Sequence, residues 1–189
     1  MDFSFTQDQE DLRRHARDLL EDICPPEYVE QCDREGHAPR EAFDKLAEKG
    51  WLGLIIPEEY GGTGGSAVDL AILLEEIGRQ SEELAMWVFR TMTYGGYAIV
   101  AHGTEEQKKK FLPQIAKGEL TYCFGLTEPE SGSDAAALTT RAEATGNSTF
   151  VINGQKVFTS GMDISDYCLL VTRTSKQERK QQGITMFHV

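Results

Sequence analysis

The stretch that decides the fold class is residues 122–134, which read YCFGLTEPESGSD. Its first half is an aromatic and apolar run that favours a β-strand, and its second half is a loop of small residues. Pro129 fixes one φ angle and biases Glu128 toward extended backbone. Gly132 permits a positive φ and a close approach of the backbone to a ligand. The stretch therefore predicts a strand that runs into an open, small-residue loop.

The spacing of apolar residues changes at this stretch. Up to about Leu120 the apolar residues recur at helical spacing, and beyond it β-branched and aromatic runs alternate with Gly, Asn and Ser turns. We therefore predict an α+β fold with two domains. The first, residues 1–120, is all-α, and the second, residues 121–189, is an incomplete antiparallel β-sheet or barrel.

Start and stop signals divide the first domain into helices. Thr6-x-x-Gln9 and Thr104-x-x-Gln107 are capping-box patterns, and Ser66 can cap a third helix. A proline ring cannot continue the helical hydrogen-bond ladder, so the first helix ends before Pro25. The predicted helices are 7–23, 27–34, 40–49, 67–77, 82–101 and 105–117. Residues 61–65, GGTGG, lack a following Lys-Ser/Thr pair, which favours a plain connecting loop over a phosphate loop.

Strand signals dominate the second domain. The predicted strands are 121–126, 149–152, 155–159, 167–174 and 184–189. Asn153-Gly154 predicts a hairpin turn between two of them, because both residues tolerate positive φ. The chain stops directly after its last strand, which would leave an open sheet edge. We take this as a sign that the β-domain is incomplete.

Composition excludes several classes of function. The formal net charge of −12 and the pI near 4.8 argue against a nucleic-acid partner. No apolar run is long enough to span a membrane, and the N-terminus has no secretory signal. The cysteines show no CxxC spacing, so we expect no metal site and reduced thiols in the cytoplasm; they are Cys24, Cys32, Cys123 and Cys168.

Two interpretations of residues 127–134 follow from residue types alone. The hydroxyls of Ser131 and Ser133 beside free N–H groups could form an anion-binding nest. An ordinary surface turn closed by Ser and Asp side chains is the alternative.

The same stretch resembles the signature of the acyl-CoA dehydrogenase family, in which a strand ends in Thr-Glu-Pro and continues to Gly-Ser-Asp. Here these positions are 127–129 and 132–134. Segments 57–62, 103–119 and 153–158 are similar to further family motifs in the same order. The resemblance covers essentially the whole chain, although the family's chains are longer.

The resemblance implies FAD as cofactor and places a set of contact residues. Leu126 and Thr127, with Phe124, fall where the family lays a strand edge along the flavin pyrimidine. Gly132 and Ser133 match positions near the FAD pyrophosphate, and Ser133 also matches a contact of the thioester substrate. The remaining two matches are Phe158, an aromatic packed against the flavin ring, and Ser160, a hydroxyl near its reactive edge.

The sequence departs from the family pattern at two of these positions. Phe158 stands in place of the commoner tryptophan, and Ser160 in place of threonine. Each retains the general chemistry, an aromatic face and a hydroxyl. The alternative for Phe158 is a simple core aromatic.

The implied reaction is FAD-dependent α,β-dehydrogenation of an acyl-CoA thioester to the 2-enoyl-CoA. Its electrons would pass to an electron-transfer flavoprotein, and the enzyme would be a homo-oligomer, a dimer or tetramer. In the family the catalytic base lies on a C-terminal helical domain, so we predict no catalytic residue in this chain. We interpret four acidic residues as solvated loop positions: Glu58, Glu59, Glu128 and Glu130. We also expect this chain to bind FAD weakly by itself.

Two other functions stay open. One is a non-catalytic truncated paralogue or subunit that assembles with a full-length partner. The other is a flavin monooxygenase built on the same scaffold.

Overall fold

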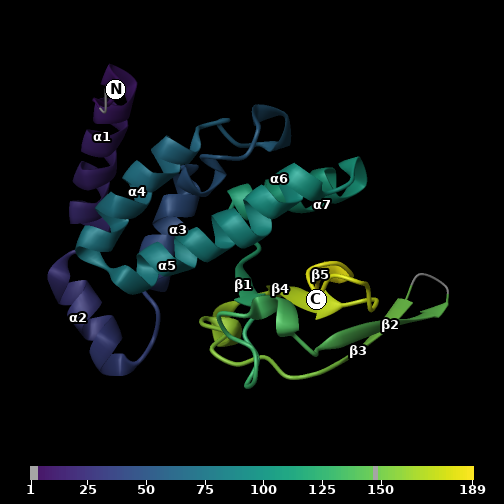
Figure 1. Ribbon diagram of the computed structural model, residues 1–189. Helices are drawn as coiled ribbons and strands as arrows, with labels where there is room; N and C mark the ends of the chain where they lie inside the picture. Colours follow the sequence, from purple (N-terminus) through teal and green to yellow (C-terminus); the bar gives the residue numbers. More distant parts are fainter. Residues whose placement is uncertain (1–3, 147–148) are drawn as a thin grey trace. The chain divides into compact units, whose positions relative to one another are not determined.

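The computed structural model describes residues 4–146 and 149–189 (Figure 1). The chain separates into two compact units, Met1–Thr121 and Tyr122–Val189. The first unit is helical and the second contains the sheet, so the predicted α+β class is confirmed. Within the described ranges, no helix combines the length and the apolar character needed to cross a membrane.

Seven α-helices are described in the first unit: α1 (Gln7–Ile23), α2 (Pro26–Glu35), α3 (Arg40–Glu48), α4 (Ala67–Gln80), α5 (Glu82–Arg90), α6 (Ala98–His102) and α7 (Glu105–Ala116). The three predicted N-caps are confirmed, because the hydroxyls of Thr6, Ser66 and Thr104 each accept from the backbone N–H three residues on. The helix predicted over 82–101 is interrupted by a π-helical segment, η3 (Thr91–Tyr97). Apolar periodicity does not distinguish the two hydrogen-bond ladders, so the sequence could not reveal this segment.

Apolar side chains and the buried Glu76 carboxylate, which pairs with Arg17, hold the helices of this unit together. The rings of Phe43 on α3 and Trp87 on α5 are stacked with centroids 4.1 Å apart. Glu76 on α4 is only 2% exposed, and its carboxylate accepts from Arg17 Nε and Nη2 of α1 at 2.9 and 2.8 Å. A buried carboxylate costs free energy unless it is paired, so this contact fixes α1 against α4.

The glycine-rich loop 61–65 is a packed connection. The N–H groups of residues 62–65 donate to carbonyl oxygens of residues 53–57. A Cβ on Gly62 would collide with the carbonyl oxygens of Ile56 and Gly53. These N–H groups are therefore not available to a phosphate, which supports the plain-loop interpretation.

The sheet of the second unit is mixed. Its strands are β1 (Tyr122–Gly125), β2 (Arg141–Gly146), β3 (Thr149–Asn153), β4 (Tyr167–Arg173) and β5 (Ile184–His188). Strand β4 pairs with β1 in parallel and with β5 antiparallel. Strands β2 and β3 form an antiparallel hairpin that joins β4 at the parallel pair Arg141–Arg173. The expectation of a purely antiparallel sheet was wrong.

The hairpin predicted at Asn153-Gly154 was also wrong. Strand β3 ends at Asn153, and residues 155–159, predicted as a strand, have no regular secondary structure. The true partner of β3 is β2, which the sequence analysis missed because its residues RAEATG have little strand character. After Gly154 the chain leaves the sheet, and the turn preference of residues 153–154 does not predict this path.

Candidate functional site

The loop after β1 is closed by its own hydrogen bonds. Glu128 N donates to Ser131 O at 2.9 Å, and Ser131 N donates to Glu128 O at 3.1 Å. The Ser131 hydroxyl, in a residue that is 4% exposed, donates to the carbonyl of Asp134 at 2.8 Å. Gly132 and Ser133 lie outside this closed part and are exposed. A Cβ built on Gly132 would meet no atom within 4 Å, so the tip of the loop is open to a ligand.

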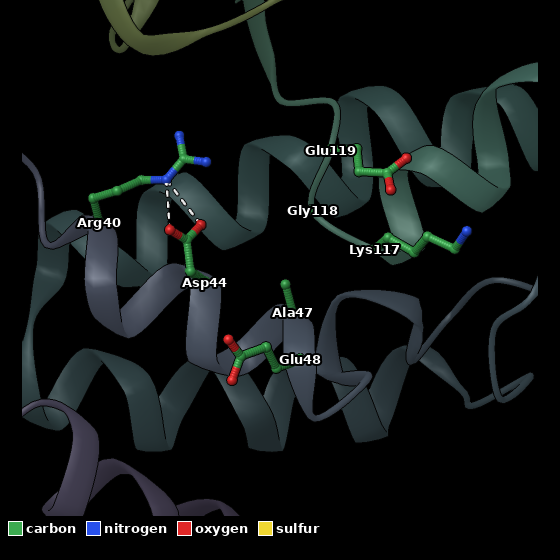
Figure 2. A pocket seen from close by; sticks show the side chains of 7 residues that line it. All are labelled: Arg40, Asp44, Ala47, Glu48, Lys117, Gly118 and Glu119. Atoms are coloured by element: carbon green, nitrogen blue, oxygen red, sulfur yellow. Dashed lines mark hydrogen bonds and ion pairs between the residues drawn. The ribbon is translucent and has the colours of Figure 1, made fainter.

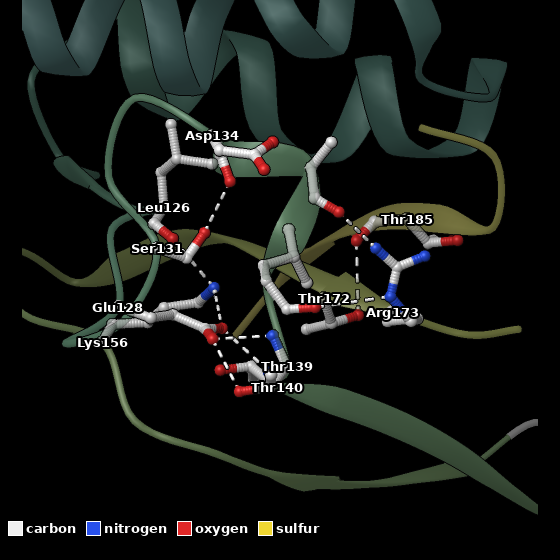
Figure 3. Close-up of polar contacts among 12 residues, drawn as sticks. Leu126, Glu128, Ser131, Asp134, Thr139, Thr140, Lys156, Thr172, Arg173 and Thr185 are labelled. Atoms are coloured by element: carbon white, nitrogen blue, oxygen red, sulfur yellow. Dashed lines mark hydrogen bonds and ion pairs between the residues drawn. The ribbon is translucent and has the colours of Figure 1, made fainter. Parts of the chain in front are cut away.

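A second segment, residues 156–160, runs beside the end of β1. Val157 N donates to Thr127 O at 2.9 Å, and Lys156 Nζ donates to Leu126 O at 2.9 Å. Figure 3 shows Lys156 extending toward Leu126 and Glu128. The structure thus brings the predicted residues Leu126 and Thr127 next to the segment that carries Phe158 and Ser160. No backbone hydrogen bond joins that segment to Gly132 or Ser133 among the described residues.

Phe158 has two unusual properties. Its side chain belongs to a residue that is 90% exposed, and its φ of 56° makes it the one non-glycine among the described residues with positive φ. A left-handed backbone costs a residue with a Cβ about 1–2 kcal/mol. The core-aromatic alternative was therefore wrong. An exposed ring on a strained backbone is typical of a ligand-contact position.

Three of the predicted residues present polar groups that have no partner within the described part of the chain. These groups are the hydroxyls of Thr127, Ser133 and Ser160. The backbone N–H of Ser160, in contrast, donates to Phe158 O at 3.1 Å. Phe124 on β1 and Leu126 after it are half-buried. An exposed aromatic face next to unpaired hydroxyls suits a ligand with a flat apolar ring and a polar edge.

Glu128 contradicts the sequence interpretation of a solvated loop residue. It is 4% exposed, and its carboxylate accepts from Thr139 N at 2.6 Å, Thr139 Oγ1 at 2.8 Å, Thr140 N at 2.8 Å and Lys156 Nζ at 2.9 Å. Burial by itself would raise the pKa of this carboxyl, but hydrogen bonds from Thr140, Lys156 and Thr139 hold the pKa well below its usual range. No local pattern in the sequence indicates these partners, because they come from two segments, residues 139–140 and residue 156, that are distant from Glu128 in the chain.

The far end of the loop is tied to the end of β4 and to the β4–β5 connection. The Arg173 guanidinium donates to the carbonyls of Ala136 at 2.7 Å and Leu138 at 3.3 Å. Lys180 forms an ion pair with Asp134 at 2.6 Å, in which both side chains are more than half exposed. Residues 134–138 are thus held by two cations from one neighbouring segment.

A pocket of about 520 Å³ lies in the helical unit (Figure 2). Its lining mixes charges of both signs, and Arg40 is already paired with Asp44 at 2.8 Å. The lining residues are Arg40, Asp44, Ala47, Glu48, Lys117, Gly118 and Glu119. It contains none of the predicted contact residues, and we assign no ligand to it.

Comparison with known proteins defines the class of this chain. Residues 6–119 match the acyl-CoA dehydrogenase N-terminal domain, and residues 123–189 match the acyl-CoA dehydrogenase middle domain. Together the two matches define the class as one with a helical domain ahead of a β-domain, the order seen in the fold. The chain belongs to the acyl-CoA dehydrogenase family, whose cofactor is FAD.

Individual relatives show how much of a family member the chain covers. It is 36% identical to acyl-CoA dehydrogenase FadE26 of Mycobacterium tuberculosis, over 100% of this chain and 48% of that protein. It is 35% identical to 3-(aryl)acrylate reductase of Clostridium sporogenes, over 98% of this chain and 48% of the relative. A solved glutaryl-coenzyme A dehydrogenase complex with glutaryl-CoA superposes with a TM-score of 0.91 at 32% identity, over 100% of this chain and 48% of that chain. The chain thus spans about half the length of the relatives it matches.

Proposed function

We propose that this chain carries the flavin- and thioester-contacting part of an acyl-CoA dehydrogenase. The proposed reaction converts an acyl-CoA to its 2-enoyl-CoA and passes the electrons to an electron-transfer flavoprotein. The observation that carries the proposal is Phe158, which is 90% exposed at positive φ beside the Thr127 strand end. An exposed ring held in this way is suited to stack on an isoalloxazine.

The residues of the site fit a bound FAD. Phe158 would cover one face of the flavin ring, and the Thr127 and Ser160 hydroxyls would donate to its polar edge. Gly132 and Ser133, at the open tip of the loop, would contact the pyrophosphate, and Ser133 would also contact the thioester. When bound, FAD supplies the hydride acceptor for the substrate β-carbon. The part of this chain would be to bind and orient both partners and to hold hydrogen-bond donors where negative charge develops.

No residue of this chain is proposed as the catalytic base. Of the four loop glutamates, Glu128 is already committed to four hydrogen bonds, and its depressed pKa makes it a weak base. The base would come from outside the 189 residues, as would the remaining FAD contacts. We further propose that the whole protein is a cytoplasmic homo-oligomer, in line with the family resemblance.

Anaerobic titration tests the proposal. The whole protein, which would include the base, is saturated with FAD and mixed with acyl-CoA thioesters of several chain lengths, and the visible flavin absorbance is followed. Bleaching of the flavin supports the dehydrogenase and contradicts a monooxygenase. A spectral shift without bleaching identifies the chain as a binding module that needs a partner for catalysis. A flavin spectrum that FAD-saturated protein and acyl-CoA leave unchanged contradicts the proposal.

The reverse reaction, reduction of a 2-enoyl-CoA by reduced flavin, is a second candidate function, because one relative at 35% identity is named a 3-(aryl)acrylate reductase. The same contacts would then orient a 2-enoyl group next to the reduced flavin. Chemically reduced holoprotein that is reoxidised by a 2-enoyl-CoA under anaerobic conditions, but is not bleached by any acyl-CoA, would favour this direction.

A further inference from the structure

Among the described residues of the second unit, the Glu128 carboxylate is the most completely bonded buried acid. Both of its oxygens accept hydrogen bonds, and four donors from residues 139, 140 and 156 surround it at 2.6 to 2.9 Å (Figure 3). Its side chain is 3% exposed, and that of its ion-pair partner Lys156 is 8% exposed. Burying two charges costs several kcal/mol per ion before pairing, so the fold maintains this pair against a large penalty.

Lys156 ties together the two segments of the proposed site. Its Nζ bonds to Leu126 O and to Glu128 Oε1, each at 2.9 Å, so one ammonium group holds the residues on both sides of Thr127. The next residue along the chain, Val157, donates its N–H to Thr127 O at 2.9 Å. Phe158, with its φ of 56°, follows directly.

Stability alone does not account for this pair. Replacing a buried ion pair by apolar residues of similar volume is often neutral or stabilising. An ion pair whose two partners are fixed by further hydrogen bonds can hold the segments that carry them in a single geometry. The position of this pair, between the two segments that carry Thr127 and Phe158, points to a role in setting the distance between them.

We propose that Glu128 and Lys156 are positioning residues, which hold Thr127 and Phe158 at the separation needed to contact one flavin. The inference rests on the proposed function. Neither residue touches the cofactor in this proposal; each acts through the backbone it fixes. Thr139 and Thr140 complete the device by orienting the Glu128 carboxylate.

The test uses four variants of the full chain: Lys156→Met, Lys156→Arg, the neutral pair Glu128→Gln/Lys156→Met, and Lys180→Met. The last is a matched control, because it breaks the exposed Lys180–Asp134 pair in the same unit. The first readout is amide hydrogen exchange of Val157, compared with that of Cys168, whose N–H donates to Val189 O at 2.8 Å. The second is the dissociation constant of FAD, from flavin difference spectra.

We expect Lys156→Met to speed Val157 exchange and to weaken FAD binding, each about tenfold or more, with Cys168 exchange unchanged. Lys156→Arg should restore both values in large part, and Lys180→Met should alter neither. The neutral double variant leaves no unpaired charge, so it remains informative even if Lys156→Met fails to fold. It should keep the Cys168 protection and lose the Val157 protection.

Wild-type exchange at Val157 and wild-type FAD affinity in the folded double variant would overturn the positioning role. Failure of the proposed function gives a different result, because then the wild-type chain itself shows no flavin spectral change at saturating FAD. In that case the amide hydrogen exchange of Val157 still shows whether the Glu128–Lys156 ion pair positions residue 157.

Discussion

The backbone N–H of Val157 donates to the carbonyl oxygen of Thr127 at 2.9 Å, which joins two segments that are distant in the sequence. Residue 158 consequently stands at the end of β1 with its ring in solvent and a φ of 56°. Strain and exposure at one residue oppose stability and are kept where a ligand uses them. This relationship makes position 158 the most direct test of the site.

Phe158→Gly should stabilise the chain and weaken its cofactor binding. Glycine relieves a left-handed backbone at a gain of about 1 kcal/mol, and removal of a ring that is 90% exposed costs little packing. Loss of aromatic stacking should weaken FAD binding about tenfold. Urea unfolding and FAD titration measure the two effects. Phe158→Ala is the control, since it removes the ring but retains the Cβ and should give no gain in stability.

Glu128→Gln should destabilise the chain by about 3 kcal/mol at neutral pH, because it leaves the Lys156 ammonium buried without its counter-charge. The folded-state pKa of Glu128 lies below its ordinary value of 4.5, so its stabilising contribution is complete above that pH and is lost as the pH falls through and below it. Unfolding free energies of the variant should therefore fall less steeply in acid than those of wild type. Glu130→Gln, at an exposed position, should stay within about 0.5 kcal/mol of wild type; a similar loss there would contradict the assignment.

Neighbouring glutamates on α4 should differ sharply in importance. Glu76 is 2% exposed and bonded to Arg17 by two hydrogen bonds, whereas the Glu75 side chain is 63% exposed. The hydrogen bond from Arg17 lowers the Glu76 pKa, so the carboxylate is ionised at neutral pH. Glu76→Gln should cost about 2 kcal/mol in urea unfolding, and Glu75→Gln under about 1 kcal/mol. Equal losses would mean that the buried contact does not fix α1 against α4.

Two glycine-to-alanine substitutions should change the free energy of unfolding in opposite directions. At Gly62 a Cβ would collide with the carbonyl oxygens of Ile56 and Gly53, so Gly62→Ala should cost about 2–3 kcal/mol. Gly78 is exposed on α4, and its Cβ would meet only Ala85 Cβ at 3.8 Å. Gly78→Ala should stabilise the helix by about 0.5–1 kcal/mol. Thermal or urea midpoints compare the two, and a tolerated Gly62→Ala would show that the loop can move away.

The isolated chain should bind FAD more weakly than a micromolar dissociation constant. It spans about half the length of its relatives, so the remaining contacts with the cofactor would lie outside these residues. Ultrafiltration with FAD over a wide concentration range measures the constant. Micromolar or tighter binding would contradict this expectation and would place most of the FAD contacts within the 189 residues.

Local signals predicted the helical half well and the sheet poorly. The N-cap residues Thr6, Ser66 and Thr104 predict where their helices begin, because an N-cap hydroxyl and the backbone N–H that donates to it are only three residues apart. The sheet depends on pairings between strands that are distant in sequence, and no residue pattern within β1 or β4 indicates that the two pair in parallel. Asn153-Gly154 has the residues of a hairpin turn, yet the chain there leaves the sheet, because contacts of the following segment with the β1 end override the turn preference.

The residues alone were enough to predict the α+β class, the place where helices give way to strands, and the loop whose residue types resemble the family signature. These features depend on side chains that act within a few residues of one another. The three-dimensional fold was needed to show that Glu128 is a buried ion-pair partner and that Phe158 is an exposed aromatic with positive φ. The same glutamate would be solvated in an isolated loop. Its burial arises because residues 139, 140 and 156 converge on it, and convergence of distant segments is a property of the fold.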